Sequence, residues 1–245
     1  MKFDTTPLRR LWQEAFGDTD EFLDAFFSTG FSPDRCRSIT MEGETAAAAY
    51  WLPCVCQGQP FAYIYAVATA KRHRGKGLCR RLMEDIHSVL KEQGYAGAIL
   101  VPQDEGLRRM YAGFGYRSGA PIHEFTAVAT APPVSLRQVS RDQYAAARRQ
   151  LLPPDAVLQE GESLAFLETQ VRFYAGDGFI LAASVKDGNL FAPELLGNTD
   201  PGGILTSLDA KDGTFRTIGG NKPFAMFLPL TKNCPVPGHF AFAFD

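Results

Sequence analysis

A basic loop with two glycines, set between a strand pattern and a helix pattern, constrains this fold more than any other feature. Phe61–Thr69 is short and mostly apolar, as a buried strand would be. After Gly77 the apolar residues recur every three or four positions, which predicts an amphipathic helix that ends at Gly94. Ala96–Val101 is again short and apolar and predicts a second buried strand. A strand, a loop, a helix and a strand in this order predict an α/β unit with roughly parallel strands.

The loop concentrates positive charge just before the predicted helix. Its four permanent cations fall within six residues: Lys71, Arg72, Arg74 and Lys76. The N-terminus of a helix binds anions, because its first N–H groups are unpaired and the positive end of the helix dipole lies there. Gly75 and Gly77 have no Cβ, so an oxygen can approach their backbone closely. The loop is a candidate diphosphate site, although a solvated basic turn or a nucleic-acid patch would have the same spacing. It is not a Walker loop, because no G-x-x-x-x-G-K-[ST] occurs here, and it is not a dinucleotide fingerprint, because Arg80 stands where the third glycine should be.

Other elements complete the first half of the chain. Helices are predicted from Thr6 to Gly17 and from Asp20 to Gly30, and short strands over Arg37–Met41 and Ala47–Cys56. Asp104 can cap a short helix that Gly115 ends.

The length of 245 residues suits one large domain or two small ones. Small residues and two prolines at Thr126–Pro133 indicate a linker, so the expected domains are 1–125 and 134–245. The second half has further helix and strand patterns: a helix at 141–152, strands at 178–185 and 189–196, a helix at 202–208, and strands at 214–218, 223–230 and 239–244. The expected fold class is α/β (α+β), with mixed twisted sheets and flanking helices.

Composition excludes several classes of protein. The 25 basic and 27 acidic residues give a net charge of −2, so no global field favours nucleic acid or a membrane surface. Five scattered cysteines lack the spacing of a metal site and are expected to be reduced and mostly buried. No apolar run is long enough to span a membrane, and the N-terminus does not resemble a signal peptide. We expect a cytoplasmic protein that binds no metal.

Three segments together resemble a known family. Arg72-His73-Arg74-Gly75-Lys76-Gly77 matches the R/Q-x-x-G-x-G/A signature of the GNAT superfamily of acetyl-CoA-dependent N-acetyltransferases. Val67-Ala68-Thr69 is similar to that family's strand end before the loop, and Tyr111-Ala112-Gly113-Phe114-Gly115-Tyr116 to its Y-x-x-F-G-Y/F segment. The likeness runs from about Thr6 to Tyr116, and the order of the three segments makes it more specific than any one of them.

The resemblance implies a GNAT fold and acetyl transfer from acetyl-CoA to a primary amine of a small molecule or peptide, by direct attack in a ternary complex. It implies a role for Tyr111 as the acid that protonates the departing thiolate. It also implies a set of acetyl-CoA-binding residues, through backbone groups and nearby charge: Val67, Ala68, Thr69, Arg72, Arg74, Gly75, Lys76, Gly77 and Leu78.

Two points about catalysis stay open in the sequence. Tyr111 shares a helical face with Leu107 and Phe114, so it is also a candidate core aromatic. Family members that carry a carboxylate base have it at the position of Phe61, which cannot accept a proton. Alternative bases are a water chain to backbone carbonyls, or one of several side chains, none of which stands out: Glu42, Glu44, Tyr63, Tyr65 and His123.

The second half resembles, more weakly, the degenerate second GNAT-like domain of tandem bacterial acetyltransferases. That likeness rests on element order and on Phe215–Ile218 followed by Pro223–Met226, and the nearest counterpart of the basic loop, Leu195–Asp200, carries an acid. The terminal Phe240–Asp245 predicts an edge strand, with a carboxylate reaching the active site as the less favoured alternative.

Three function classes remain, in order of preference. The first is the N-acetyltransferase, and the second is a non-catalytic acyl-CoA-binding or sensor protein that lacks a general base. The third is a nucleic-acid-binding protein, which is disfavoured because aromatic residues do not interleave with the basic residues. A homodimer is allowed, but the sequence leaves the oligomeric state open.

Overall fold

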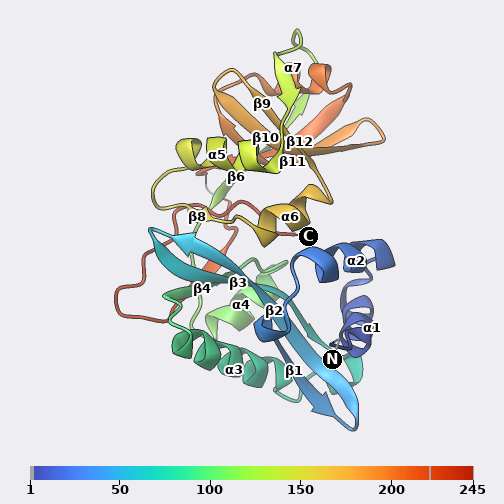
Figure 1. Ribbon diagram of the computed structural model, residues 1–245, viewed down its shortest axis with the longest axis vertical. Coiled ribbons are helices and arrows are strands. Elements are labelled where there is room, and N and C mark those ends of the chain that lie inside the picture. The colour runs from blue at the N-terminus through green and yellow to red at the C-terminus, as the bar shows by residue number, and fades with distance from the viewer. Residues whose placement is uncertain (1–2, 221, 245) are drawn as a thin grey trace. The chain divides into compact units, whose positions relative to one another are not determined.

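The computed structural model describes residues 3–220 and 222–244, and it divides into two units. Unit 1 comprises Met1–Arg117 and Met226–Pro235, and unit 2 comprises Ser118–Ala225 and Val236–Asp245. The helices of unit 1 are α1 (Thr6–Phe16), α2 (Asp20–Thr29), α3 (Leu78–Glu92) and α4 (Glu105–Ala112), with short 3-10 turns at Pro33–Arg35 and Lys71–His73. Its strands are β1 (Cys36–Met41), β2 (Glu44–Cys56), β3 (Gln59–Thr69), β4 (Gly97–Leu100) and β13 (Met226–Pro229), with β5 (Arg117–Ser118) at the boundary (Figure 1).

The sheet of unit 1 runs in the order β1-β2-β3-β4-β13-β5. β1, β2 and β3 form an antiparallel meander, whereas β3 and β4 are parallel and are joined through α3. β13, far away in the sequence, pairs antiparallel with β4 from Met226↔Leu100 to Pro229↔Gly97. The predicted strand–loop–helix–strand unit is therefore present, with the expected parallel strands.

β3 separates from β4 near the middle of its length. The two strands pair only from Phe61↔Gly97 to Tyr63↔Ile99, yet β3 continues to Thr69. A β-bulge follows, because three residue steps from Tyr65 to Ala68 on β3 face two on β2. Ala66 lies in this bulge with φ 48°, a left-handed conformation that is uncommon for a residue with a Cβ. The bulge and the separation leave the last residues of β3 without a neighbour on the β4 side.

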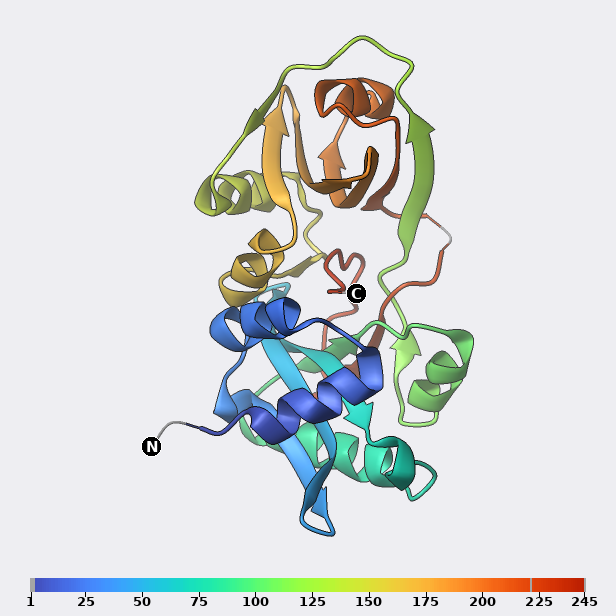
Figure 2. The same ribbon diagram turned by 90° about the vertical axis from the view of Figure 1, so that its right-hand side faces the viewer.

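Helices cover both faces of this sheet. Alternate residues of β2 point to opposite faces: Trp51 packs with Leu82 and Ile86 of α3, whereas Tyr50 packs against Trp12 and Phe26. Figure 2 shows α1 and α2 in front of β2 and β3. The basic loop leads directly into the helix that covers the other face.

Unit 2 contains a second mixed sheet. Its six strands follow the order β6-β12-β11-β10-β9-β7: β6 (Ile122–Val128), β7 (Leu136–Gln138), β9 (Arg172–Gly176), β10 (Phe179–Lys186), β11 (Asn189–Gly197) and β12 (Asp212–Ile218). The remaining elements are α5 (Arg141–Leu151), β8 (Val157–Leu158), α6 (Glu162–Glu168) and α7 (Pro201–Ser207). β10 and β11 are antiparallel, and β11 is parallel to β12. Hydrophobic side chains of α7, including Ile204 and Leu205, pack on one face.

Unit 2 also buries an ion pair. Arg148 and Glu194, each 1% exposed, form an ion pair at 2.8 Å, and the Tyr144 hydroxyl donates to the same carboxylate at 2.6 Å. Arg148 also donates to the carbonyl oxygen of Gln159 at 3.0 Å. The Gln159 side chain in turn pairs with both the N–H and the C=O of Phe242. These bonds connect the interior of unit 2 to its C-terminal segment.

Several expectations about the second half differ from the structure. The expected linker at 126–133 overlaps β6, which pairs with β12 through seven residues, so the boundary between the units lies near Arg117 instead of near 125. Phe240–Phe244 is not a strand, and Asp245 lies outside the described residues. Phe215–Ile218 and Met226 belong to different sheets, because β13 pairs in unit 1. These elements depend on pairing between distant segments, which local patterns do not reveal.

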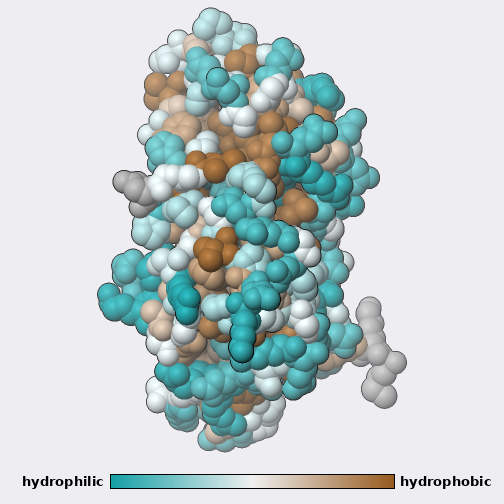
Figure 3. All heavy atoms as spheres, turned by 90° about the vertical axis from the view of Figure 1, so that its left-hand side faces the viewer, coloured by the Kyte–Doolittle hydropathy of each residue, from teal (hydrophilic) through white to brown (hydrophobic). Residues whose placement is uncertain are grey.

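The described surface carries few large hydrophobic side chains. On the face shown in Figure 3, hydrophilic residues surround smaller brown patches. Exposed large hydrophobic residues are scattered along the chain, and one of them, Phe16 at 44% exposure, ends α1. Within the described residues, no helix has the length and apolar character that crossing a bilayer requires.

Candidate functional site

A cavity of about 480 Å³ in unit 1 collects most of the residues singled out in the sequence. It is lined by the end of β3, the basic loop and the first turn of α3, and by α4 with the residues before it. The lining residues are Ala15, Phe16, Val67, Ala68, Thr69, His73, Arg74, Gly75, Gly77, Leu78, Cys79, Gln103, Asp104, Leu107, Met110 and Tyr111. The cavity is therefore lined by the part of β3 that no longer pairs with β4.

The N-terminus of α3 is open toward this loop. Its N-cap, Gly77, makes no side-chain cap bond, and the first helical bond comes from the N–H of Arg81. Gly75 and Gly77 both have φ 75°, and a Cβ at either position would meet no atom within 4 Å. The glycines are needed for their left-handed backbone, and the space beside them is open. Unpaired N–H groups next to open space suit an anionic ligand.

The structure separates the four cations of the loop. Arg74 lines the cavity, and its Nε donates to the Thr69 carbonyl oxygen at 3.2 Å. Arg72 forms an ion pair with Glu44, and the Lys76 ammonium lies 3.2 Å from Nδ1 of His73. Arg72 and Lys76 do not line the cavity. Lys71 donates its backbone N–H to Glu14 at 2.7 Å, which ties the loop to α1. Arg74 is therefore the cation best placed for direct contact with a ligand.

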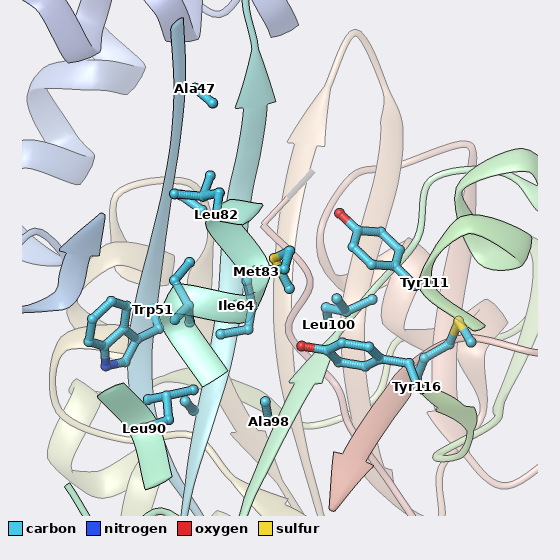
Figure 4. Close-up of a cluster of buried hydrophobic side chains, with 14 of the residues drawn as sticks. Ala47, Trp51, Ile64, Leu82, Met83, Leu90, Ala98, Leu100, Tyr111 and Tyr116 are labelled. Atoms are coloured by element: carbon cyan, nitrogen blue, oxygen red, sulfur yellow. The ribbon is translucent and has the colours of Figure 1, made fainter. Parts of the chain in front are cut away.

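Tyr111 lies at the cavity wall and also packs in the core. Figure 4 shows it beside Tyr116, near Leu100 and Met83, and the two tyrosine rings are 5.8 Å apart. The Tyr116 hydroxyl pairs with Nε2 of His87 at 2.9 Å, whereas the Tyr111 hydroxyl has no hydrogen bond within the described residues. Burial raises the pKa of Tyr111, and the nearby Cys79 thiol adds to this effect. Tyr111 is thus a neutral donor with a free hydroxyl, as an acid would need to be.

The general base has no obvious candidate in this cavity. Phe61 is buried against Gly97, where a Cβ would lie 2.6 Å from its ring, so its role is packing. The suggested alternatives in unit 1 are not among the cavity residues: Glu42, Glu44, Tyr63 and Tyr65. His123 is exposed on β6 of unit 2. Among the residues described, no three His, Cys, Asp or Glu side chains come together as a metal site would need.

Sequence reasoning missed several cavity residues. Phe16 and Ala15 come from α1, which is remote in sequence and bears no motif. His73 lies inside the matched signature, yet nothing in its spacing shows that its side chain is only 1% exposed. The sequence predicts only an ordinary thiol at Cys79, and this residue lines the cavity at the start of α3. Burial raises the pKa of the Cys79 thiol, which disfavours the reactive thiolate.

Comparison with protein families and with curated proteins gives one match. The acetyltransferase (GNAT) domain family matches residues 2–119. No curated protein matches the chain closely enough to count as a relative.

Several solved structures share the fold. A GCN5-related N-acetyltransferase from Kribbella flavida has 18% identity and a TM-score of 0.68, over 94% of this chain and 71% of that one. A conserved protein of unknown function from Enterococcus faecalis, described as a probable N-acyltransferase, has 16% identity and a TM-score of 0.72, over 94% and 72%. Eis1 from Mycobacterium abscessus has 11% identity and a TM-score of 0.66, over 94% and 73%.

At these identities the structural likeness shows a shared fold, and the family match supports acyl transfer in general terms. The three motif segments lie within the matched residues and border one cavity. Residues 2–119 therefore form an acetyltransferase domain of the GNAT family.

Proposed function

We propose that this protein is an N-acetyltransferase that moves an acetyl group from acetyl-CoA to a primary amine of a small molecule or peptide. The main support is one cavity that is lined by the end of β3, the open N-terminus of α3 and Tyr111. The end of β3 offers backbone hydrogen bonds to an extended ligand, the N-terminus of α3 offers N–H groups to an anion, and Tyr111 offers a proton.

The residues of the cavity fit acetyl-CoA along its length. Backbone groups of Val67 and Thr69, in the part of β3 that has no β4 neighbour, would bind the pantetheine arm in the manner of an added strand. The N–H groups from Gly75 to Leu78 would hold the diphosphate, with the charge of Arg74 beside it. Arg72 and Lys76 would contribute at longer range, because they are engaged with Glu44 and His73.

When bound, acetyl-CoA supplies a thioester whose carbonyl carbon an amine can attack. The C–N bond forms, the C–S bond breaks, and the departing sulfur takes the proton of the Tyr111 hydroxyl. The amine must be neutral, so its proton leaves to water or to a base. Holding both reactants in one site lowers the barrier through orientation alone.

A non-catalytic acyl-CoA-binding protein is the second candidate. It is favoured by one observation: none of the side chains suggested as a base in unit 1 lines the cavity. This candidate predicts tight binding of acetyl-CoA without turnover for any amine.

We propose that unit 2 is a degenerate GNAT-like domain. The order β11–α7–β12 joins two parallel strands through a helix, as β3–α3–β4 does in unit 1. Asp200 caps α7 through the N–H of Gly202 at 2.8 Å, and a Cβ on Gly203 would lie 2.8 Å from the Pro132 carbonyl oxygen. An acid and a nearby loop occupy the place where unit 1 has cations and open space. Unit 2 would then act on acceptor selectivity instead of binding acetyl-CoA.

Calorimetric titration tests the proposal, with acetyl-CoA as ligand and desulfo-CoA and ATP as controls. We expect micromolar binding of acetyl-CoA and much weaker binding of ATP. A panel of amines with a thiol-detecting dye then separates the two candidates, because only the enzyme releases CoA in an amine-dependent way. If acetyl-CoA does not bind at millimolar concentration, both candidates are wrong.

A further inference from the structure

His73 is a buried polar residue within the basic loop. Its side chain is 1% exposed, and the residue lines the cavity between the end of β3 and the open glycines. Its backbone N–H donates to the Ala70 carbonyl oxygen at 2.9 Å, which closes the 3-10 turn Lys71–His73. A histidine in such a position must find partners for its ring nitrogens inside the protein or on a ligand.

The contact with Lys76 decides where the ring proton lies. The Lys76 ammonium is 3.2 Å from Nδ1 of His73. An ammonium group has three donors and no acceptor, so Nδ1 must offer its lone pair. A neutral imidazole with an unprotonated Nδ1 carries its proton on Nε2. The N–H donor of the His73 ring therefore lies at Nε2.

This donor is unsatisfied by the protein. Nε2 is buried and has no hydrogen-bond partner among the residues that the structure describes. Buried donors are nearly always paired, and one that is left unpaired is unfavourable. Arg74, Gly75 and Gly77 line the same cavity, and each favours an anionic oxygen there through charge or free backbone space. The missing acceptor is therefore best supplied by an anion bound at the loop.

We propose that Nε2–H of His73 donates a hydrogen bond to a diphosphate oxygen of acetyl-CoA, and that Lys76 positions His73 by fixing its tautomer. This inference rests on the proposed function. It makes His73 a binding residue for the acyl donor. It also gives Lys76, which does not line the cavity, a role through its neighbour instead of through direct contact with phosphate.

Nitrogen-15 NMR of histidine-labelled protein tests the tautomer and the contact without any substitution. In the free protein we expect His73 to show a protonated Nε2 and an unprotonated Nδ1. Saturating CoA should move the Nε2–H proton downfield, whereas S-acetylpantetheine, which lacks phosphates, should leave it in place. His87, whose Nε2 already pairs with Tyr116 at 2.9 Å, serves as the internal reference. A His73 signal that CoA does not move, or that S-acetylpantetheine moves equally, overturns the assignment to phosphate.

Two substitutions separate the roles of the pair. His73→Phe keeps a planar ring and removes the donor, so we expect about tenfold weaker binding of CoA and unchanged binding of S-acetylpantetheine. Lys76→Met should allow both neutral tautomers of His73 in the nitrogen-15 spectrum and weaken CoA binding less than His73→Phe. Equal CoA affinity in His73→Phe, with the unaltered protein still binding CoA, overturns this inference and leaves the proposed function intact. Absence of CoA binding by the unaltered protein overturns both.

Discussion

At the scale of single residues, the environment of each titratable side chain decides its chemistry. Tyr111 and His87 both lie near Tyr116, yet only the Tyr111 hydroxyl is without a partner in the described residues. Burial raises the pKa of Tyr111, so its phenol stays protonated across the neutral range. Burial lowers the pKa of His87 to about 4, with the Lys91 charge adding to the shift. The first residue is prepared to donate a proton, and the second stays neutral.

Replacing Tyr111 by Phe should lower turnover far more than acetyl-CoA affinity. A positioned general acid contributes at least about 100-fold to the rate, so we expect kcat to fall by about that factor. The ring and its packing remain, so the dissociation constant should change by no more than about twofold. Steady-state kinetics and calorimetry measure the two effects. Tyr116→Phe is the matched control, because that residue does not line the cavity and its loss should affect stability instead of kcat. If Tyr111→Phe has the same kcat as the unaltered protein, Tyr111 serves only in packing.

His87 should make stability depend on pH. Its folded pKa of about 4 lies below the usual histidine value of 6.5, so between these values the unfolded chain binds a proton that the folded protein does not. Stability from this residue is therefore full above about pH 6.5 and decreases as the pH falls toward 4. His87→Gln keeps a donor for the Tyr116 hydroxyl and removes the titration. We expect the loss of unfolding free energy between these pH values to shrink by about 2 kcal/mol.

Urea denaturation at a series of pH values measures this difference. His123→Gln, at an exposed position on β6, is the control. A His87→Gln profile that parallels the unaltered protein would contradict the argument.

At the scale of elements, irregular backbone shapes the candidate site as much as the regular strands and helices do. The bulge at Ala66 and the left-handed glycines at 75 and 77 all lie between the second half of β3 and the start of α3. The strand ends free of β4, and the helix begins without a side-chain cap. These departures from regular pairing create the unpaired groups to which a ligand can bind.

An acid at position 75 should abolish the anion site. Gly75→Asp places a carboxylate beside the predicted diphosphate, and we expect about 100-fold weaker binding of acetyl-CoA from charge repulsion. Gly75→Asn has nearly the same shape, tolerates a positive φ and lacks the charge, so it should bind several-fold more tightly than Gly75→Asp. Gly58→Asp, also at φ 75° but in the β2–β3 turn, controls for backbone strain. Calorimetry compares the three variants, and equal affinity for Gly75→Asp and Gly75→Asn would contradict a nearby phosphate.

The C-terminal segment of unit 2 depends on one side-chain amide. Gln159 donates to the Phe242 carbonyl oxygen at 2.9 Å and accepts from its N–H at 3.0 Å, which imitates a strand pair. Gln159→Leu leaves both backbone groups buried and unpaired, so we expect a loss of about 2 to 4 kcal/mol in unfolding free energy. The exchange of the Phe242 amide proton should accelerate with it. Gln150→Leu, on the exposed side of α5, should change stability by less than about 0.5 kcal/mol. Unchanged protection of the Phe242 amide in Gln159→Leu would show that Gln159 does not hold the C-terminal segment.

At the scale of the whole molecule, the units are not contiguous in sequence. β13 belongs to unit 1 although more than a hundred residues of unit 2 precede it. It covers the edge of β4 and buries Met226 and Phe227. A chain cut near residue 125 therefore loses a strand of the sheet that carries the cavity.

A chain of residues 1–118 should consequently unfold at a lower temperature than one in which 1–118 is joined to 226–235. The junction needs only a short glycine-rich linker, because the Gly119 N–H already donates to the Ala225 carbonyl oxygen at 3.1 Å. We expect the joined chain to gain at least about 2 kcal/mol, since it buries Met226 and Phe227 and pairs β4 on its open edge. A version with residues 226–235 scrambled is the control. Identical melting curves for all three chains would mean that β13 does not stabilise unit 1.

Local patterns predicted the helices, the strands around the basic loop and the three segments that identify the family, because each depends on neighbours in sequence. Thr6–Phe16, Leu78–Glu92 and the Asp104 cap follow from periodicity and capping chemistry alone. Several residues implied by the motif line the cavity, but Arg72 and Lys76 do not, and the places of Phe16, His73 and Cys79 in it depend on packing.

Tertiary structure alone decided which distant segments pair and which polar groups are buried. Four features leave no signal in the local sequence: the pairing of β13 with β4, the bulge at Ala66, the buried Arg148–Glu194 ion pair and the buried ring of His73. Strand pairing and burial are set by the free energy of the whole packed unit, to which residues far apart in the chain contribute together. The amino-acid pattern therefore determined the family and the chemistry of the loop, and the packed fold decided which of its side chains can meet a ligand.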